Sequence, residues 1–124
     1  MIDEDIQVGE YIRTIYGMIG KIENINDYRP PESRYAVDIQ LGDLIFLGEK
    51  HILKHSFDIT DLIEVGDYVN GYLIMENEGK LKRGNAYVVF KRNGHDYLEI
   101  WAEEDIETIV THEMMERAEY KVGE

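Results

Sequence analysis

The sequence predicts a mainly β protein (a β-rich α+β fold) built from two small β-barrel half-domains in tandem, with one short helix near its C-terminal end. Three observations support this prediction. Short segments rich in β-branched and aromatic residues alternate with turn residues along most of the 124-residue chain. One seven-residue motif occurs twice, and only the segment after Thr111 has a helical pattern. A single, more open β-barrel is the alternative arrangement.

The repeated motif is Ile-Gln-Val-Gly-Glu-Tyr-Ile at residues 6–12 and Ile-Glu-Val-Gly-Asp-Tyr-Val at residues 63–69. The two copies are 57 positions apart and are identical at four of seven positions. The same offset relates Ile52–His55 to Ile109–His112. Two matches at one offset indicate a duplication. We therefore predict a first β half-domain at residues 1–57 and a second, carrying the helix, at residues 58–124, packed together as one compact unit.

Turn residues divide each half into strands. In the first half, Gly17 and Gly42-Asp43 separate the expected strands, and Pro30-Pro31 marks a loop over residues 27–33, because consecutive prolines donate no ladder hydrogen bonds. Asn93-Gly94 predicts a tight hairpin in the second half. The expected strands are Tyr11–Tyr16, Met18–Ile25, Tyr35–Leu41, Leu44–Leu47, Tyr87–Arg92 and Asp96–Trp101. A Val-Gly-acid turn followed by short strands suggests SH3-like barrels.

Two further segments complete the second half. Residues Glu78–Gly84, which include Lys80, Lys82 and Arg83, are expected to form an exposed loop. The helix is expected to begin after Thr111 as N-cap, with Glu113 in the first turn. Its apolar stripe is Met114, Met115 and Ala118, and Tyr120–Val122 is expected to return as a terminal strand.

Composition restricts the cellular context. The chain has no cysteine, which excludes disulfides and thiolate metal sites and favours a reducing compartment. Its acidic beginning lacks the basic and apolar regions of a secretory signal. No apolar run approaches the length of a membrane span. We expect a soluble protein of the cytoplasm that makes no membrane contact.

Negative charge is concentrated at the two ends of the chain. The formal net charge is −13. Residues 1–10 and 99–124 together contain thirteen acidic residues and two basic residues, so the central part is nearly neutral. Such a field repels nucleic acid and attracts basic surfaces. Direct binding of nucleic acid is therefore not expected, even though residues 80–83 form a short basic segment.

No pattern in the sequence indicates catalysis. Carboxylates are so frequent that a pair of them carries no information about a glycosidase-like mechanism. Gly17–Lys21 lacks the spacing of a phosphate-binding loop, and His112–Glu116 lacks the second histidine of zinc proteases. His51 and His55 would share a helix face, but their segment favours a strand and no third ligand is evident. We expect His55 and His112 to occupy the same structural position in each half. The prediction is a protein that is not an enzyme and has no catalytic residue, cofactor or metal.

One resemblance adds context. The segment Lys54–Gly71, with its Lys-His-Ser, Asp-Leu-Ile-Glu-Val-Gly-Asp-Tyr-Val-Asn-Gly pattern, resembles small uncharacterised proteins encoded by phages and prophages of Firmicutes. The opening Val8–Thr14 and the closing Ile109–Thr111 are similar as well. The resemblance implies an accessory gene of a bacterial virus. No functional residue of this chain can be assigned from the resemblance.

Together, the charge and this resemblance suggest a non-enzymatic, phage-encoded accessory protein. It would bind a basic, nucleic-acid-binding host protein through an acidic face that imitates DNA, and so inhibit host defence. The predicted partner-binding residues are Asp3, Glu4, Asp5, Glu103, Glu104, Asp105, Glu107, Glu113 and Glu116. Two alternatives stay open: a small-ligand (nucleotide) binding protein that uses Lys80, Lys82, Arg83 and tyrosines, and a structural component of the virion. The oligomeric state also stays open, a dimer included.

Overall fold

The chain divides into two compact units, Met1–Leu62 and Ile63–Glu124, in a computed structural model. The structure describes residues 5–39, 43–82, 84–90 and 94–118. Each unit is described below by itself. The first unit begins with the first copy of the repeated motif and the second unit begins with the second copy.

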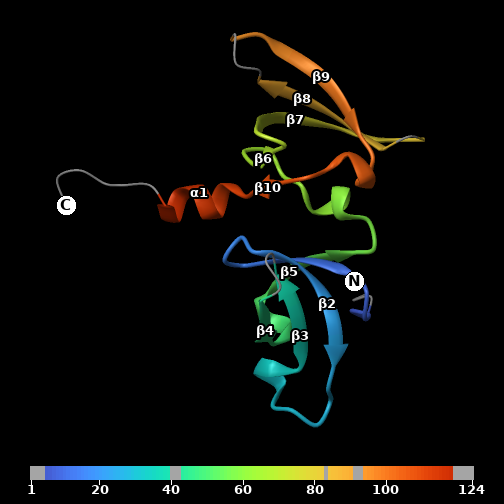
Figure 1. The fold of residues 1–124 in the computed structure, drawn as a ribbon, viewed down its shortest axis with the longest axis vertical. Helices are drawn as coiled ribbons and strands as arrows, with labels where there is room; N and C mark the ends of the chain where they lie inside the picture. Colours follow the sequence, from blue (N-terminus) through green and yellow to red (C-terminus); the bar gives the residue numbers. More distant parts are fainter. Residues whose placement is uncertain (1–4, 40–42, 83, 91–93, 119–124) are drawn as a thin grey trace, which may run out of the picture. The chain divides into compact units, whose positions relative to one another are not determined.

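The first unit contains one antiparallel sheet (Figure 1). Its strands are β1 (Tyr11–Thr14), β2 (Ile19–Ile25), β3 (Tyr35–Ile39), β4 (Leu44–Leu47) and β5 (Ile52–Ser56). The strand order is β4-β3-β2-β1-β5, so the first strand lies between the second and the last. Three short 3₁₀ turns lie between or after these strands. The turn η1 (Pro31–Ser33) precedes β3, η3 (Glu49–His51) precedes β5, and η4 (Ile59–Leu62) ends the unit.

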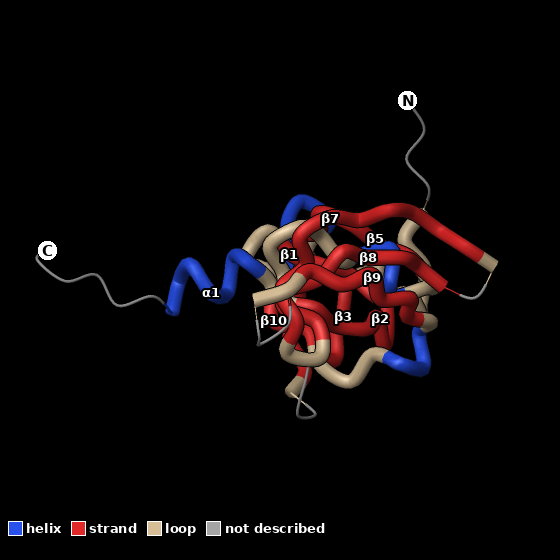
Figure 2. Tube along the Cα trace, turned by 90° about the horizontal axis from the view of Figure 1, so that it is seen from above, coloured by secondary structure: helices blue, strands red, loops and turns tan. Residues whose placement is uncertain are grey.

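The second unit repeats this topology. Its strands are β6 (Tyr68–Val69), β7 (Tyr72–Leu81), β8 (Gly84–Phe90), β9 (Asp96–Trp101) and β10 (Ile109–Val110), in the order β10-β6-β7-β8-β9. The turn η5 (Glu103–Asp105) precedes the last strand, as η3 does in the first unit. Helix α1 (His112–Ala118) follows β10 and projects from the strands of its unit (Figure 2).

The repeated motif forms the same turn in both units. Gly9 and Gly66 have φ values of +94° and +97°, a region that favours glycine. The N–H groups of these glycines donate to the carbonyls of Ile22 and Ile74, both at 2.9 Å. The next residue, Glu10 or Asp67, is a buried carboxylate. The internal repeat that the sequence indicates therefore corresponds to a repeated backbone geometry.

The second sequence match, by contrast, is out of register. Ile12 pairs with His55 in the first unit, but Val69, which is equivalent to Ile12, pairs with Ile109. The equivalent residues at the closing strand are thus 54 positions apart, not 57. His55 lies within β5, whereas His112 follows β10 and begins α1. The prediction that these histidines occupy the same position is wrong, because the residue equivalent to His55 is Ile109, three positions before His112.

Each sheet has its own core. The first consists of Ile12, Ile22, Val37 and Leu47. In the second unit, the ring of Trp101 lies 5.6 Å from the ring of Tyr87 and 6.2 Å from that of Tyr72, measured between centroids. The other buried apolar residues of that unit are Ile63, Val69, Ile74, Ala86, Val89 and Ile109. Alternate residues of the central strands supply both cores, as a half-buried sheet requires.

The structure corrects two expectations. The sheets are not closed barrels, because within the described residues the end strands β4 and β9 each pair on one side only. Segment Glu78–Gly84 is not a loop: β7 continues to Leu81 and pairs with β8 through an irregularity between Asn77 and Gly79. Both faces of this hairpin end are mostly exposed, so its residues lack the apolar alternation by which strands are predicted.

The other expected elements are confirmed where they are described. The hairpin around Gly17 and the pair β8–β9 are present, although residues 40–42 and 91–93 of the two remaining predicted turns lie outside the described residues. Thr111 caps α1, because its Oγ1 accepts the Met114 N–H at 3.3 Å. Met114 and Met115 are exposed. The predicted strand Tyr120–Val122 lies outside the described residues. No helix in the described ranges is long and apolar enough to cross a membrane.

A turn that we did not predict joins β6 to β7. Asn70 and Gly71 have φ values of +52° and +83°, which is typical of a two-residue hairpin turn. The Asn70 side chain also holds the closing segment. Its Oδ1 accepts the N–H groups of Glu107 (2.8 Å) and Thr108 (3.2 Å), and its Nδ2 donates to the Asp105 carbonyl (2.8 Å).

We expect Asn70→Ala to lower the free energy of unfolding by about 2 kcal/mol, because it removes these hydrogen bonds and places alanine at positive φ. Urea unfolding measures the loss. Asn77→Ala is the control, because the Asn77 Oδ1 accepts the N–H of Gly79, a neighbour two positions along the same strand, at 3.0 Å. Equal effects of the two substitutions would contradict this role of Asn70.

Candidate functional site

Most of the predicted partner-binding acids lie in one segment of the second unit. Between residues 103 and 116 there are six acids and neither lysine nor arginine. Glu103, Glu104, Asp105 and Glu107 are exposed, as is Glu116 on α1, whereas Glu113 is half-buried. Asp5 belongs to the first unit and is exposed; Asp3 and Glu4 lie outside the described residues. We call residues 103–107 the acidic segment.

The acidic segment has a fixed backbone. The Asp105 Oδ2 accepts the Ala102 N–H at 2.9 Å, which closes the η5 turn. The Asn70 side chain holds the backbone on both sides of Ile106. Asp105 therefore has a structural task that the sequence analysis did not assign to it. The carboxylates of Glu103, Glu104 and Glu107 form no ion pair with any lysine or arginine in the part of the chain that the structure describes.

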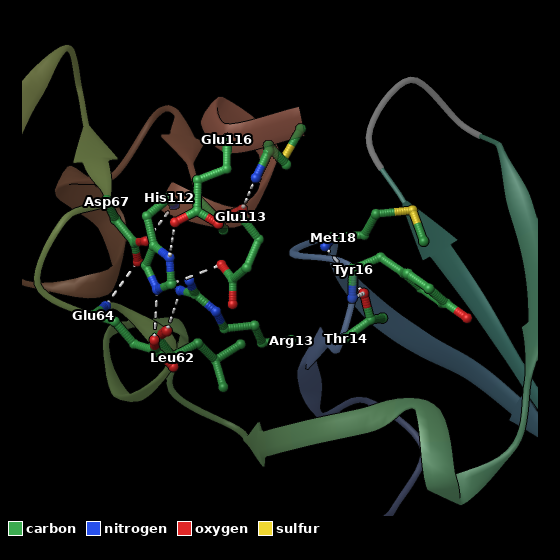
Figure 3. A network of polar contacts seen from close by, with 12 residues as sticks. Arg13, Thr14, Tyr16, Met18, Leu62, Glu64, Asp67, His112, Glu113 and Glu116 are labelled. Carbon is green, nitrogen blue, oxygen red and sulfur yellow. Dashed lines mark hydrogen bonds and ion pairs between the residues drawn. The ribbon is translucent and has the colours of Figure 1, made fainter. Parts of the chain in front are cut away.

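Glu113 and Glu116 face a histidine (Figure 3). The His112 Nε2 lies 2.9 Å from the Glu64 Oε1 and 3.6 Å from the Glu113 Oε1, and its Nδ1 lies 4.0 Å from the Glu116 Oε1. The ligand atoms of Glu64, His112 and Glu113 lie within 4.8 Å of one another, so these three residues could hold a divalent cation. The hydrogen bond between His112 and Glu64 also fastens the start of α1 to its unit. Glu113 and Glu116 are thus partly occupied by an intramolecular contact.

Buried carboxylates connect the repeated turn to the end of each unit. The Glu10 carboxylate accepts the Gln7 N–H at 2.6 Å and lies 2.9 Å from the His55 Nδ1. The Asp67 carboxylate accepts the Glu64 N–H at 2.7 Å and the His112 backbone N–H at 2.9 Å. Sequence reasoning missed both carboxylates. The available signal was their position after glycine in the repeated motif.

The other two histidines, His51 and His95, contact residues that are close to them in the sequence. The His51 Nδ1 accepts the Gly48 N–H at 3.2 Å within η3, so His51 and His55 have separate partners. His95 lies beside Tyr97 near the β8–β9 turn, with ring centroids 6.4 Å apart. Among the described residues, neither His51 nor His55 belongs to a group of metal-ligating side chains.

A small pocket of about 190 Å³ lies in the first unit. Its lining is Pro31, Glu32, Arg34, Tyr35, Glu49 and Lys50. It is smaller than typical ligand sites of roughly 300–1,000 Å³. None of the basic residues proposed to bind a nucleotide lines it: Lys80 and Lys82 lie in the β7–β8 hairpin, and Arg83 lies outside the described residues.

The outer strand β9 exposes apolar side chains next to the acidic segment. Leu98 is 60% exposed and Ile100 is 47% exposed, and both lie on the face of β9 opposite the buried Trp101. Phe90, on the neighbouring strand β8, is 42% exposed. The acidic segment begins two residues after β9 ends. An apolar strand edge and a row of carboxylates therefore adjoin each other.

Comparisons with known proteins identify no relative: no family model, curated protein or solved structure matches this chain.

Tyr35, beside the pocket, supplies a test of the first unit. Burial raises the pKa of its phenol, and the negative charges of Glu49 and Asp27 raise the pKa further. Because the folded state retains the proton to higher pH than the unfolded chain, this contribution to stability is complete below about pH 10 and is lost as pH rises through the raised pKa.

We expect Tyr35→Phe to make alkaline unfolding less steep above about pH 10 and to remove, from an absorbance titration at 295 nm, one component that titrates above the usual tyrosine range. Tyr28→Phe is the matched control, because Tyr28 is fully exposed. The assignment fails if both variants keep the wild-type pH dependence.

Proposed function

We propose that this chain is a non-enzymatic, phage-encoded accessory protein that binds a basic, nucleic-acid-binding host protein through the acidic segment of its second unit. Inhibition of a defence enzyme by imitation of DNA is the activity that fits this binding. The proposal also places the protein in the bacterial cytoplasm.

The observation that carries the proposal is the row of exposed carboxylates at Glu103, Glu104 and Glu107, which pair with no lysine or arginine in the described part of the chain. Charges held on a fixed backbone attract and orient a basic partner without the entropic cost of ordering a flexible tail. The phosphates of one DNA strand are spaced about 3.4 Å apart along the helix axis, and the carboxylates of Glu103, Glu104 and Glu107 would imitate such a row of negative charges.

We further propose that each unit is SH3-like. In support, both sheets place the first strand between the second and the last, and both units have a 3₁₀ turn between the fourth strand and the last. A small antiparallel sheet of this kind is a rigid platform, and its loops and edges are free to bind other molecules.

The test is affinity capture from a Firmicutes lysate with the full chain at about 50 mM and 300 mM salt. Wild type should retain a basic protein at low salt and lose most of it at high salt, because exposed charge pairs are screened within about 8–10 Å near physiological ionic strength. The triple variant Glu103→Lys, Glu104→Lys, Glu107→Lys should lose the partner at both concentrations.

The matched control carries the same change in net charge on exposed residues of the first unit: Glu23→Lys, Glu32→Lys, Glu49→Lys. It should retain the partner. Equal capture by both triple variants, or capture by wild type that does not change with salt, would refute the proposal.

A further inference from the structure

We infer that the partner of the acidic segment binds as an extended strand along the outer edge of β9, with its lysine or arginine side chains beside Glu103 and Glu104. This inference rests on the proposed function and adds to it the chemical class of the bound segment: a basic cluster followed by alternating apolar residues.

The first argument is the unused side of β9. Along its length, from Asp96 to Trp101, β9 pairs with β8 in an unbroken antiparallel register. No other strand among the described residues pairs with it. The outer side of β9 therefore has no strand partner within the described ranges, and peptides commonly bind to such sheet edges by adding a strand.

The second argument is the exposed side chains of this edge. Native proteins protect edge strands with charges, proline or a covering element. Here Leu98 and Ile100 lie on one face and are about half-exposed or more, and Phe90 extends the same apolar strip to β8. An added strand with apolar residues at alternate positions would cover this strip.

The third argument comes from the equivalent edge of the first unit. Phe46 of β4 pairs with Ala36, just as Ile100 of β9 pairs with Ala86, and Leu44 corresponds in the same way to Leu98. In the first unit a basic side chain already covers this edge: the Arg29 guanidinium lies 4.2 Å from the centre of the Phe46 ring. At β9, an arginine or lysine of the partner would take that place.

Charge complementarity fixes the direction and the chemistry of the bound segment. The acidic segment begins just beyond the end of β9. Antiparallel pairing, the commoner arrangement and the one that β9 makes with β8, would place the beginning of the partner strand beside Trp101 and Glu103. Basic residues should therefore precede the apolar ones in the partner.

The experiment measures binding of a fluorescent peptide, Lys-Arg-Lys-Val-Thr-Val-Thr-Val, to the full chain by anisotropy. Two isomers of the peptide each carry two N-methyl groups, either on the first two valines or on the two threonines. Successive N–H groups of a strand point to opposite sides, so only one isomer loses its donors to β9. We expect one isomer to bind at least about tenfold more weakly than the other, as the loss of two or three hydrogen bonds implies.

The variant Leu98→Lys, Ile100→Lys should weaken binding by a similar factor. The matched variant Leu44→Lys, Phe46→Lys, on the equivalent edge of the first unit, should bind as wild type does. A reversed peptide, Val-Thr-Val-Thr-Val-Lys-Arg-Lys, should bind more weakly than the original.

Each contrary outcome has a distinct meaning. If both methylated isomers bind equally well and binding still depends on salt and on Glu103, edge docking is wrong and the proposed function survives. If no basic peptide binds while the lysate still yields a partner, edge docking is likewise wrong. A dimer that Leu98→Lys, Ile100→Lys dissociates would identify a second copy of the chain as the occupant of the edge and would overturn the inference.

Discussion

A buried carboxylate that fastens the opening turn of each unit to its closing segment is the contact on which the described architecture depends. Glu10 and Asp67 each accept the N–H of the residue three positions earlier. Glu10 also bonds to the ring of His55 within β5, and Asp67 accepts the backbone N–H of His112 after β10. Leaving such a donor buried and unsatisfied costs about 1–3 kcal/mol. The sheet order follows from this contact, because the first strand is held beside the last.

The sequence predicted the elements that depend on local chemistry. The glycines of the repeated motif and Gly17 have the positive φ values that their turns require, and Thr111 caps the helix as expected. Register was beyond prediction. The three-residue shift is already present at β4 and β9, where the equivalent residues Phe46 and Ile100 are 54 positions apart, so it arises in the hairpins before those strands, where the two units differ in length.

The Asn70-Gly71 turn and the long β7–β8 hairpin were missed for opposite reasons. Asn-Gly is a strong turn signal, but it follows a strand of only two residues, which is too short to show alternation. The end of β7 has no buried face, so its charged residues resemble those of a loop. Strand pairing with β8, which is a tertiary contact, decides its structure.

For the candidate site, the sequence identified the acidic residues but not their separate tasks. Asp105 closes a turn, Glu113 and Glu116 face His112, and Glu103, Glu104 and Glu107 are exposed and have neither task. The β9 edge was not predicted, because Leu98 and Ile100 have the alternation of a core-facing strand. The core instead uses the opposite face, where Trp101 packs against Tyr87.

Native-state hydrogen exchange of Asp67→Asn tests the central contact most directly. The asparagine keeps the size of the side chain but loses one acceptor oxygen. We expect protection of the Glu64 and His112 amides to fall at least about tenfold further than protection of the β7–β8 ladder, because the local donors lose a charged acceptor. Equal losses at all these amides, or no loss, would contradict the account.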